Sequence, residues 1–368
     1  MATEKRKTKP IGLAIVGSGR VGRIRGLCAA EYPGVEWIGC CDLKEEVAKK
    51  LAEDLNADFY TTDYKELLAR PEVTASVLAT DENERVGTLM ASIERGHDIL
   101  AEKPLATVAV ESENVRKAAA DAGVDLVVGY TQRFRRRWLL AKSRVASGGL
   151  GDVTSATSRA FMNRDAPISR LKITEYRSRL TPMVVSGTHA LDIVLWCLEG
   201  KTPVEVYARS VNKTLGGYGG LDGTFGVFTF DDGTVWSMSM SWALPSVWPA
   251  STYSLEIGIV GTKGVLTIDD THRDIVLATE DGEKTHRPGE NKHVSFLGSY
   301  PPGDYHGGQF WGPMREETNS WFSRIHAGVK THHATAEEGH RNLVLTMAMD
   351  LSAKRKKAVE LPVDLSEL

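Results

Sequence analysis

Short apolar runs alternate with longer amphipathic stretches in the first part of the chain. The apolar runs predict strands at 11–16, 35–41, 76–79, 98–101 and 126–129. The stretches between them predict helices at 21–30, 44–55, 85–95 and 108–122. Strands and helices that alternate build a parallel sheet, and strands this apolar need cover on both faces. The pattern therefore predicts an α/β domain with a doubly wound parallel sheet over residues 1–130.

Beyond Gly148 and Gly149 the pattern changes, because strands begin to follow strands. Strands are expected at 204–210, 225–230, 235–240, 253–260, 265–269 and 275–278, with hairpin residues at Asp232-Gly233 and 261–264. Helices are expected at 135–146, 188–198, 310–326 and 337–353, packed on one face of the sheet. The polar segment 281–308 predicts a long loop. Residues 131–368 should form an α+β domain with a largely antiparallel open sheet, for substrate binding and oligomerisation.

Composition and charge narrow the class of protein. Of 368 residues, 42% are hydrophobic, and 48 acidic against 45 basic side chains leave a net charge of −3. This excludes a disordered chain and provides no general attraction to nucleic acid or to a membrane. The sequence has no apolar run of membrane-spanning length and its first ten residues are polar, so we expect a cytoplasmic protein. We expect reduced, mostly buried thiols and no metal site from the four cysteines Cys28, Cys40, Cys41 and Cys197.

A glycine-rich turn directly follows the first expected strand and opens the first expected helix. It consists of Gly17, Ser18, Gly19, Arg20, Val21 and Gly22. Gly17 would make the tight turn, Gly19 would let backbone N–H groups approach a pyrophosphate, and Gly22 would let helix and strand pack closely. Asp42 ends the next strand about 20 residues on, as expected of an acid that binds the adenosine ribose. The turn predicts a Rossmann dinucleotide site, with a purely structural turn as the alternative.

Asp42 also bears on the identity of the dinucleotide. A carboxylate suits a free 2′-hydroxyl and repels a 2′-phosphate, so NAD is favoured over NADP. Lys44, two residues on, offers a cation to a phosphate and keeps NADP open. Asp42 could also cap the helix that begins near Lys44, and the two roles are compatible.

Lys103 lies in the sequence Glu102-Lys103-Pro104, directly after the strand expected at 98–101. The carboxyl ends of strands in a doubly wound sheet face the ligand crevice. Lys103 should therefore point toward the nicotinamide end of the cofactor, with Pro104 stiffening the turn. The alternative for a single lysine is a solvated surface charge.

Four motifs together resemble the glucose-fructose oxidoreductase, inositol dehydrogenase and MocA (Gfo/Idh/MocA) family. They are the glycine-rich turn, Glu102-Lys103-Pro104, Gly187-x-His189-x-x-Asp192, and Thr335-Ala-Glu-Glu-Gly339 before an apolar helix. The resemblance covers nearly the whole chain, from residue 11 to about residue 363. The glycine motif is unspecific, whereas the Glu-Lys-Pro tripeptide at this point of a Rossmann domain is a specific marker.

The resemblance implies an NAD(P)-dependent dehydrogenase that transfers a hydride between nicotinamide and a secondary hydroxyl of a sugar, cyclitol or sugar acid. It implies that Lys103 contacts the substrate hydroxyl and the nicotinamide ribose, and that His189 is an acid or base on that hydroxyl. Alcohol oxidation requires a proton acceptor, and both residue types can provide one. Asp192 would orient the imidazole or favour the helix N-terminus, and His189 could instead be a core histidine. Thr80, Glu102 and Lys103 would bind the cofactor.

The chain departs from the family pattern at two places. Val185 stands where many members carry an Asp four residues before the histidine, so a Lys-Asp-His set lacks its acid. Many members follow the strand near residue 79 with Thr-Pro-Asn and a nearby His, whereas this chain continues from Thr80 as Thr-Asp-Glu-Asn-Glu-Arg. The first departure bears on the mechanism, and the second bears on a loop that faces the cofactor.

Arginines near the expected substrate pocket bear on the charge of the substrate. Arg133 lies in a segment that resembles part of the family's pocket wall, although the arginines after it are typical of a solvated face or subunit contact. Arg164, Arg177 and Arg179 precede the His189 helix, where family members place substrate contacts. Because a guanidinium can hold a carboxylate with two hydrogen bonds, we hypothesise a sugar acid or another anionic polyol. Internal salt bridges are the alternative.

Aromatic residues bear on assembly. Trp236, Trp242 and Trp248 lie in or just after expected strands, and Trp311 and Trp321 lie near the C-terminal helices. Such residues predict either a core or a buried subunit interface. Family members commonly pair through this sheet, so we expect a homodimer or homotetramer.

Two other functions stay open at this point. A redox-neutral isomerase or lyase would use tightly bound NAD to oxidise and later reduce one substrate. A non-catalytic dinucleotide-sensing protein would keep the fold without the chemistry. Lys103 and His189 argue against the sensing protein, and no added DNA-binding module is visible in the sequence.

Overall fold

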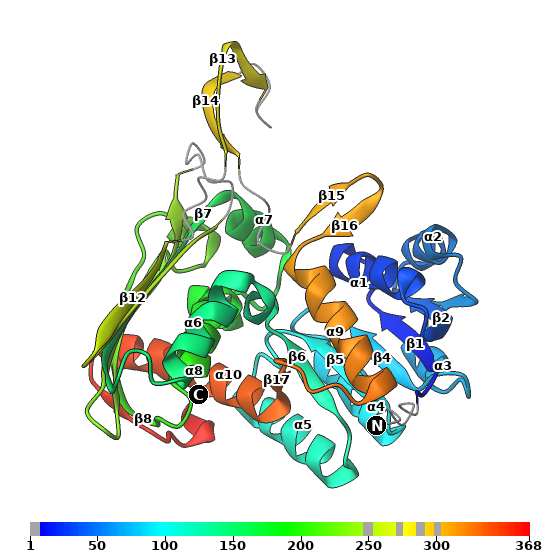
Figure 1. The fold of residues 1–368 in the computed structure, drawn as a ribbon, viewed down its shortest axis with the longest axis horizontal. Helices are drawn as coiled ribbons and strands as arrows, with labels where there is room; N and C mark the ends of the chain where they lie inside the picture. Colours follow the sequence, from blue (N-terminus) through cyan, green and yellow to red (C-terminus); the bar gives the residue numbers. More distant parts are fainter. Residues whose placement is uncertain (1–7, 246–252, 270–274, 285–290, 298–302) are drawn as a thin grey trace, which may run out of the picture. The chain divides into compact units, whose positions relative to one another are not determined.

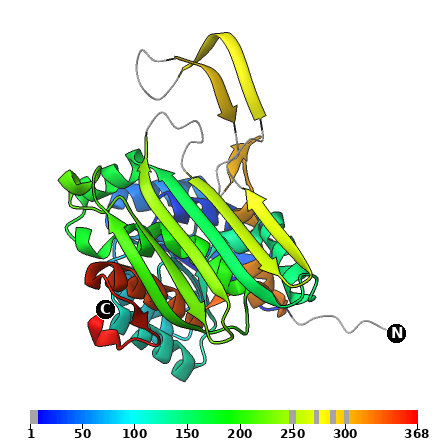
Figure 2. The ribbon, with the colours of Figure 1, turned by 90° about the vertical axis from the view of Figure 1, so that its left-hand side faces the viewer.

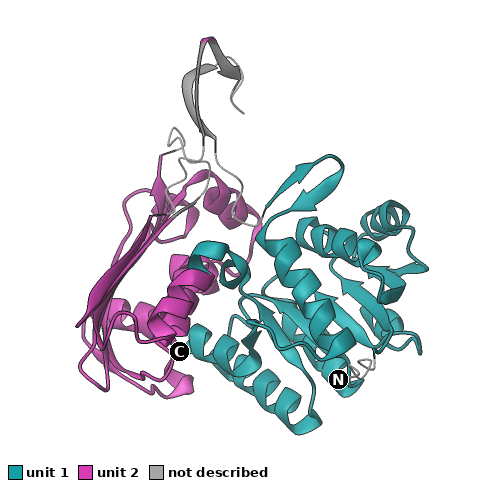
Figure 3. Cartoon of the chain, viewed as in Figure 1, with its two compact units in different colours: residues 1–138, 302–344, 368 teal, residues 139–301, 345–367 magenta. Residues whose placement is uncertain are grey.

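The computed structural model describes residues 8–245, 253–269, 275–284, 291–297 and 303–368. The chain divides into two compact units, which Figure 3 colours separately. Unit 1 consists of residues 1–138, 302–344 and 368, and unit 2 consists of residues 139–301 and 345–367. The expected division at residue 130 assigns 302–344 to the second domain, whereas this segment packs within unit 1. Within the described ranges, every helix is too short or too polar to cross a membrane.

Unit 1 is built on the predicted parallel sheet (Figure 1). Its strands are β1 (Ile11–Val16), β2 (Val35–Cys41), β3 (Phe59–Thr61), β4 (Ala75–Leu78), β5 (Asp98–Glu102), β6 (Leu126–Gly129) and β17 (Ala334–Thr335). They lie in the order β17-β6-β5-β4-β1-β2-β3, and all pairs are parallel except β17 with β6. The direction in which successive strands are added changes between β1 and β4. A doubly wound sheet binds its ligand at this switch point. The fold prediction for this half is confirmed.

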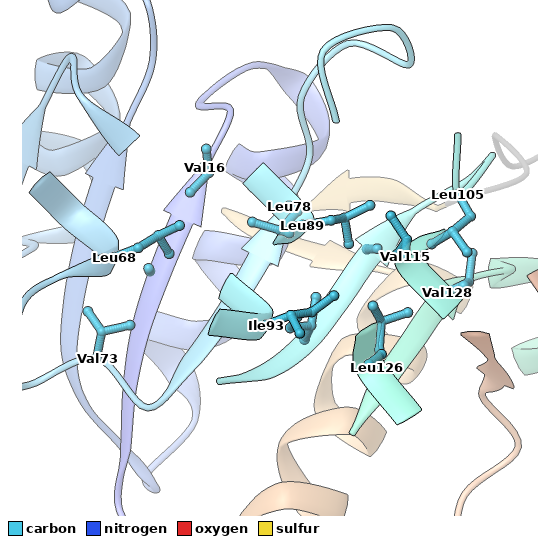
Figure 4. Packing of buried hydrophobic residues seen from close by; sticks show 14 of the residues in the cluster. Val16, Leu68, Val73, Leu78, Leu89, Ile93, Leu105, Val115, Leu126 and Val128 are labelled. Atoms are coloured by element: carbon cyan, nitrogen blue, oxygen red, sulfur yellow. The ribbon is translucent and has the colours of Figure 1, made fainter. Parts of the chain in front are cut away.

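Helices cover both faces of this sheet. They are α1 (Arg20–Glu31), α2 (Glu45–Leu55), α3 (Tyr64–Leu68), α4 (Arg85–Glu94), α5 (Ala109–Ala122) and α9 (Pro313–Ala327). One apolar cluster contains Leu78 together with Leu89 of α4 and Val115 of α5 (Figure 4). The cluster on the other face contains Leu51 of α2 and Trp321 of α9. Because α9 fills a place on this sheet, the segment that contains it belongs to unit 1 despite its distance in sequence.

Unit 2 is built on a largely antiparallel open sheet, as predicted (Figure 2). Its strands are β7 (Val153–Asn163), β8 (Pro203–Val211), β9 (Gly223–Phe230), β10 (Val235–Leu244), β11 (Tyr253–Gly261), β12 (Gly264–Asp269) and β18 (Val359–Glu360). They lie in the order β12-β11-β7-β10-β9-β8-β18, and the β7–β10 pair is parallel. The expected hairpin turns are present, since Gly233 has a φ of +83° and Gly261 pairs with Gly264.

Helices lie behind one face of this sheet (Figure 2). The helix expected here at 310–326 is the exception, because α9 packs on the sheet of unit 1. The other α-helices in the described part of the chain are α6 (Arg136–Ala146), α7 (Asp165–Ile173), α8 (Thr188–Cys197) and α10 (Ala336–Arg355). The covered face is apolar, and Trp236 on it is fully buried and stacks on Phe228 with ring centroids 5.0 Å apart. Trp242 and Trp321 are also buried, so these tryptophans form cores. Trp311 is 54% exposed. Residue 248, for which a core or interface role is expected, lies outside the described residues.

The expectation of a long loop at 281–308 is wrong for its described part. β13 (Ile275–Lys284) pairs with β14 (Asn291–Leu297), and β15 (Asp304–His306) pairs with β16 (Gln309–Trp311). The second hairpin turns at Gly307 and Gly308, which both have positive φ. Polar composition does not exclude a ribbon, because the backbone groups that face the partner strand pair with each other whatever the side chains are, and water can satisfy the outward-facing groups. The helix expected at 310–326 accordingly begins only at residue 313.

Candidate active site

The three glycines of the turn after β1 differ in the space around them. Gly17 has a φ of +94°, and a Cβ there would lie 2.6 Å from the carbonyl carbon of Ala79. A Cβ on Gly22 would lie 1.9 Å from the carbonyl oxygen of Gly17. A Cβ on Gly19, in contrast, would meet no atom within 4 Å. Gly17 and Gly22 are therefore required by the fold, whereas the space beside Gly19 is open to a ligand.

The N-terminus of α1 faces this open space with its N–H groups. Gly19 is the N-cap residue, no side chain among the described residues caps the helix, and its first turn contains no acid. Arg20 is exposed, Val21 is half-buried, and the Ser18 hydroxyl donates to the Cys41 carbonyl oxygen at 3.1 Å. Uncapped N–H groups and the helix dipole together form a binding site for an anion such as a pyrophosphate.

Asp42 lies beside this turn, directly after β2. Its Oδ2 accepts a hydrogen bond from the Ser18 N–H at 3.0 Å, and its Oδ1 accepts one from the Lys44 N–H at 3.1 Å. The side chain is half-buried. The N-cap residue of α2 is Lys44, so the idea that Asp42 caps this helix is wrong. The two N–H groups hold the carboxylate at the edge of the phosphate-binding turn, where an acid can accept hydrogen bonds from ribose hydroxyls.

Thr80 and Lys103 follow the two strands on the other side of β1. The Thr80 hydroxyl is buried and has no hydrogen-bond partner in the part of the chain that the structure describes. An orphaned buried donor of this kind fits a ligand group. Lys103 begins the turn after β5, and its peptide bond to Pro104 is cis. Burial lowers the pKa of the Lys103 ammonium, which favours a neutral amine that can accept a proton.

Glu102 is placed in a buried ion-pair network. Arg25 Nε donates to Glu102 Oε1 at 2.9 Å, and Arg25 Nη2 donates to Glu317 Oε2 at 2.9 Å. The Thr131 hydroxyl also donates to Glu317 Oε2, at 2.8 Å. Burial alone would lower the pKa of Arg25, but Glu102 and Glu317 raise it by more, so the guanidinium stays charged. The Glu102 carboxylate thus fastens the end of β5 to α1 and α9, and its expected contact with the cofactor stays a prediction.

His189 and Asp192 lie in the first turn of α8 in unit 2. His189 is half-buried between the buried Thr188 and Ala190, and Asp192 is fully buried. A π-helical segment (Met183–Gly187) precedes α8 and includes residue 185, where the family acid is missing. Such segments often mark functional sites.

Two hydrogen bonds hold this π-helical segment and the residues before it. Trp242 Nε1 donates to Ser186 Oγ at 2.9 Å, and Thr181 Oγ1 donates to Asp350 Oδ2 at 2.5 Å. Asp350 is half-buried, and burial raises the pKa of its carboxyl to about 6. The approach to His189 is therefore anchored to β10 and to α10.

The arginines expected to contact substrate have different surroundings. Arg133 is buried, and its two Nη atoms donate to the Glu338 carboxylate at 3.2 and 2.9 Å, which is the geometry of a structural ion pair. Arg177 and Arg179 are exposed, and Arg164 is half-buried. Arg177 Nε donates to a backbone carbonyl at 2.7 Å, whereas the Arg179 guanidinium lies 5.2 Å from the centre of the Tyr176 ring. Substrate contact by these arginines stays a prediction.

Two protein-family profiles match this chain, in agreement with its strand order, its glycine-rich turn and the turn that contains Lys103. Residues 11–130 match the profile of an oxidoreductase family with an NAD-binding Rossmann fold, and residues 138–267 match the C-terminal domain of the same family. The chain belongs to the GFO/IDH/MocA family. Its dinucleotide site is therefore an NAD-binding site, which the open space at Gly19 and the Thr80 hydroxyl fit.

Relatives within the GFO/IDH/MocA family act on several carbohydrates. The scyllo-inositol 2-dehydrogenase (NAD(+)) of Bacillus subtilis (strain 168) is 23% identical over 273 residues, which cover 73% of this chain and 77% of the relative. The 2,7-anhydro-N-acetylneuraminate hydratase of Mediterraneibacter gnavus is 28% identical over 266 residues, which cover 71% and 68%. The structure of scyllo-inositol dehydrogenase from Lactobacillus casei with NAD(H) and scyllo-inositol is 17% identical, with a TM-score of 0.79 over 96% of this chain and 100% of that chain. At this identity the structural likeness shows the shared fold.

Sequence reasoning missed the residues that support the site from behind. Arg25 and Glu317 hold the end of β5, Asp350 holds the approach to α8, and Arg85 joins the turns after β4 and β5. Arg25 did carry a signal, because it stands between the apolar residues Ile24 and Cys28 of α1, where a charged side chain needs a buried partner.

Proposed function

We propose that this protein oxidises a secondary hydroxyl group of a sugar, cyclitol or sugar acid by transferring a hydride to NAD. The observation that carries the proposal is the Lys103 ammonium, whose pKa is lowered by burial in the turn after β5 of an NAD-binding sheet. Relatives named as inositol and glucoside dehydrogenases support the substrate class.

The residues that would hold NAD are those of the glycine-rich turn and its neighbours. The N–H groups at the start of α1 would bind the pyrophosphate, and the Asp42 carboxylate would accept hydrogen bonds from the adenosine ribose. The Thr80 hydroxyl would donate to a cofactor oxygen. NAD, when bound, supplies the hydride acceptor. Asp42 would repel a 2′-phosphate, which supports NAD over NADP.

Lys103 would accept the proton that the substrate hydroxyl releases. A neutral amine is required for this step, and burial favours that form. We propose His189 as a second acid–base group, since it is half-buried at the start of α8 while its neighbours are buried. Asp192 would orient it from the same turn. Val185, in place of the family acid, can take no part in this proton transfer.

We also propose that two copies of the chain associate through the open face of the sheet in unit 2. This face exposes Tyr207, Phe225 and Val227, each between 37% and 44% exposed, opposite the face that helices cover. A trough of about 350 Å³ over β7, β10, β11 and β12 is lined mostly by polar and charged residues, such as Ser237, Ser239 and Glu256. Exposed apolar side chains around a polar trough fit a self-complementary contact. Light scattering that gives the mass of a dimer or tetramer supports this proposal, and a monomer at assay concentration contradicts it.

The cysteines support a cytoplasmic location for the protein. Cys28, Cys40, Cys41 and Cys197 are buried and free. Burial raises the pKa of the Cys40 and Cys41 thiols to about 12, so neither forms a reactive thiolate near neutral pH. Free thiols are typical of proteins in a reducing compartment.

The test is turnover of a substrate panel. The protein is incubated with NAD and with neutral cyclitols, sugars, sugar acids and their keto forms, while the absorbance of the reduced cofactor is followed. Lys103→Met should abolish turnover and leave NAD affinity within about twofold, because only the proton acceptor is lost. Lys65→Met, a substitution of an exposed lysine on α3, is the control. Full turnover by Lys103→Met, or NAD binding without conversion of any substrate, contradicts the proposal.

A further inference from the structure

Arg85 is a buried cation at the start of a helix. It is 2% exposed and is the first residue of α4, where the helix dipole disfavours positive charge. Burial lowers the pKa of its guanidinium, while the carboxylates of Glu102, Glu82 and Asp81 oppose that effect. Its Nε atom is buried and has no hydrogen-bond partner among the described residues. A charge kept in such surroundings indicates a role beyond packing.

The guanidinium of Arg85 joins two turns at the carboxyl edge of the sheet in unit 1. Nη2 donates to the carbonyl oxygen of Thr80 at 2.7 Å, and Nη1 donates to the carbonyl oxygen of Pro104. The backbone ladder between β4 and β5 ends at the pair Leu78–Ala101. Beyond this pair, where the two strands no longer bond to each other, Arg85 joins them through one hydrogen bond to the turn after β4 and one to the turn after β5.

An uncharged bridge crosses the same gap. Thr107 Oγ1 donates to Asn83 Oδ1 at 3.1 Å. Asn83 lies two residues before Arg85, and Thr107 lies three residues after Pro104. The two bridges join the same segments and differ in charge, so the Thr107 hydroxyl offers a matched control for Arg85.

The charge of Arg85 also acts on the lysine in the second turn. Burial is the main cause of the lowered pKa of Lys103, and Arg85 lowers it further. Glu82 and Glu102 oppose both effects. Arg85 and the two carboxylates of Glu82 and Glu102 thus act in opposite directions on the Lys103 ammonium.

We propose that Arg85 is a positioning residue for proton exchange at Lys103. Its guanidinium holds the Lys103 turn against the Thr80 turn, and its fixed charge disfavours a second cation beside it. The catalytic meaning of this inference rests on the proposed function, whereas the coupling between the two side chains can be measured without turnover. Arg85 ends the segment 80–85, where the chain departs from the family pattern, and the proposal gives this arginine a role.

The coupling is tested in substrate-free protein by competitive acetylation across a range of pH, with Lys103 followed by mass spectrometry. Arg85→Gln removes the charge and should raise the pKa of Lys103, which makes the amine several-fold less reactive below that pKa. Arg85→Lys keeps the charge, and Thr107→Val removes only the uncharged bridge, so both should leave this pKa close to that of the wild type. An unchanged pKa in folded Arg85→Gln, or an equal rise of the pKa in Arg85→Lys, overturns the proposal.

The consequence for the reaction is tested by the pH dependence of kcat/KM. In Arg85→Gln, the acidic limb of the pH profile for substrate oxidation should move to higher pH by the same amount as the pKa of Lys103 measured by labelling. In Thr107→Val, the limb should not move. A uniform loss of rate without a shift of the limb would mean a structural role and overturn the proposal. If the wild type itself turns over no substrate in the panel, the proposed function fails, and the labelling experiment still decides whether Arg85 acts on Lys103.

Discussion

The Asp42 carboxylate is held 3.0 Å from the backbone nitrogen of Ser18, in the turn that opens α1. This contact ties the proposed ribose acid to the proposed phosphate site. Asp42→Asn should raise the KM for NAD about tenfold or more, because the ribose hydroxyls would lose a charge-assisted acceptor. The preference for NAD over NADP should fall in the same variant, since the amide does not repel a phosphate.

Asp63 provides the matched control for Asp42. It follows the neighbouring strand β3, and its Oδ1 accepts a hydrogen bond from the Lys65 N–H at 2.8 Å, as the N-cap of α3. Asn is an equally good N-cap, so Asp63→Asn should leave both stability and NAD kinetics unchanged. Equal effects of the two substitutions on cofactor preference would refute the ribose role of Asp42.

Two glycines of the same turn should respond differently to alanine. At Gly19 a Cβ meets no protein atom and φ is −69°, so Gly19→Ala should cost less than about 1 kcal/mol of unfolding free energy. It should nevertheless weaken NAD binding about tenfold or more, because the methyl group occupies the space of the pyrophosphate. At Gly22 the Cβ lies 1.9 Å from a carbonyl oxygen, and Gly22→Ala should cost about 2 kcal/mol or more.

Thermal unfolding with and without NAD separates these two glycine effects. Gly19→Ala should unfold near the wild-type temperature and gain little stability from added NAD. Gly22→Ala should unfold at a lower temperature even without NAD. A Gly19→Ala variant that NAD stabilises as much as it stabilises the wild type would contradict the proposed phosphate site.

The parallel sheet could be predicted from sequence because its strands are buried on both faces and so form continuous apolar runs. Strand β7 was not predicted, since Ser, Thr and Arg alternate with its buried residues in Val153–Asn163. A strand of a sheet that is open on one face needs apolar residues only at alternate positions. β3 was missed for another reason, because its three residues are too short for any periodicity.

The cofactor site could be predicted because its chemistry is local in sequence. A glycine-rich turn and an acid after the next strand follow from chain geometry alone. The supporting contacts could not be predicted in this way. Arg25 and Glu317 are 292 positions apart, and Arg133 and Glu338 are 205 apart. Only the packing of α9 and α10 decides which buried arginine meets which carboxylate.

The network around Arg25 should be sensitive to the loss of its cation. Arg25 is fully buried and faces two carboxylates, those of Glu102 and Glu317. Arg25→Met leaves both acids without their partner and should cost about 3–5 kcal/mol in denaturant unfolding. Burial raises the pKa of Glu317, Arg25 opposes this effect, and Glu102 adds to it. A Gln amide oxygen at this position can still accept hydrogen bonds from Arg25 and Thr131, and Arg25 keeps Glu102 as its charged partner. Glu317→Gln should therefore cost much less, and equal costs for the two variants would exclude this account.

Asp350 should make stability depend on pH. Its side chain is half-buried, and burial raises the pKa of the carboxyl from 3.8 to about 6. Between these values the folded state binds more protons than the unfolded state, so the free energy of unfolding falls as pH rises through this window. Asp350→Asn removes the ionisation and should be more stable than the wild type at pH 8, by up to about 3 kcal/mol. The difference should vanish near pH 4.

Denaturant unfolding of three proteins across pH tests this account of Asp350. Thr181 and Thr224 donate hydrogen bonds to the carboxylate at 2.5 and 3.2 Å. The Asn amide can accept from one hydroxyl through its oxygen and donate to the other through its NH2 group, whereas Asp350→Ala leaves both hydroxyls unpaired and should gain no stability. If the free energy of unfolding of Asp350→Asn equals that of the wild type at every pH, the carboxyl does not titrate in this range.

Arg179 tests the charge of the substrate. Its guanidinium lies 5.2 Å from the Tyr176 ring centre and is exposed, which leaves its hydrogen-bond donors accessible to a carboxylate. If the substrate is a sugar acid, Arg179→Ala should lower kcat/KM about tenfold or more for the acid and leave a neutral polyol unaffected. Arg209 is the control, because it is likewise exposed and lies 4.5 Å from the Tyr207 ring centre, on the sheet. Activity confined to neutral cyclitols, and unchanged by Arg179→Ala, would rule out the anionic substrate.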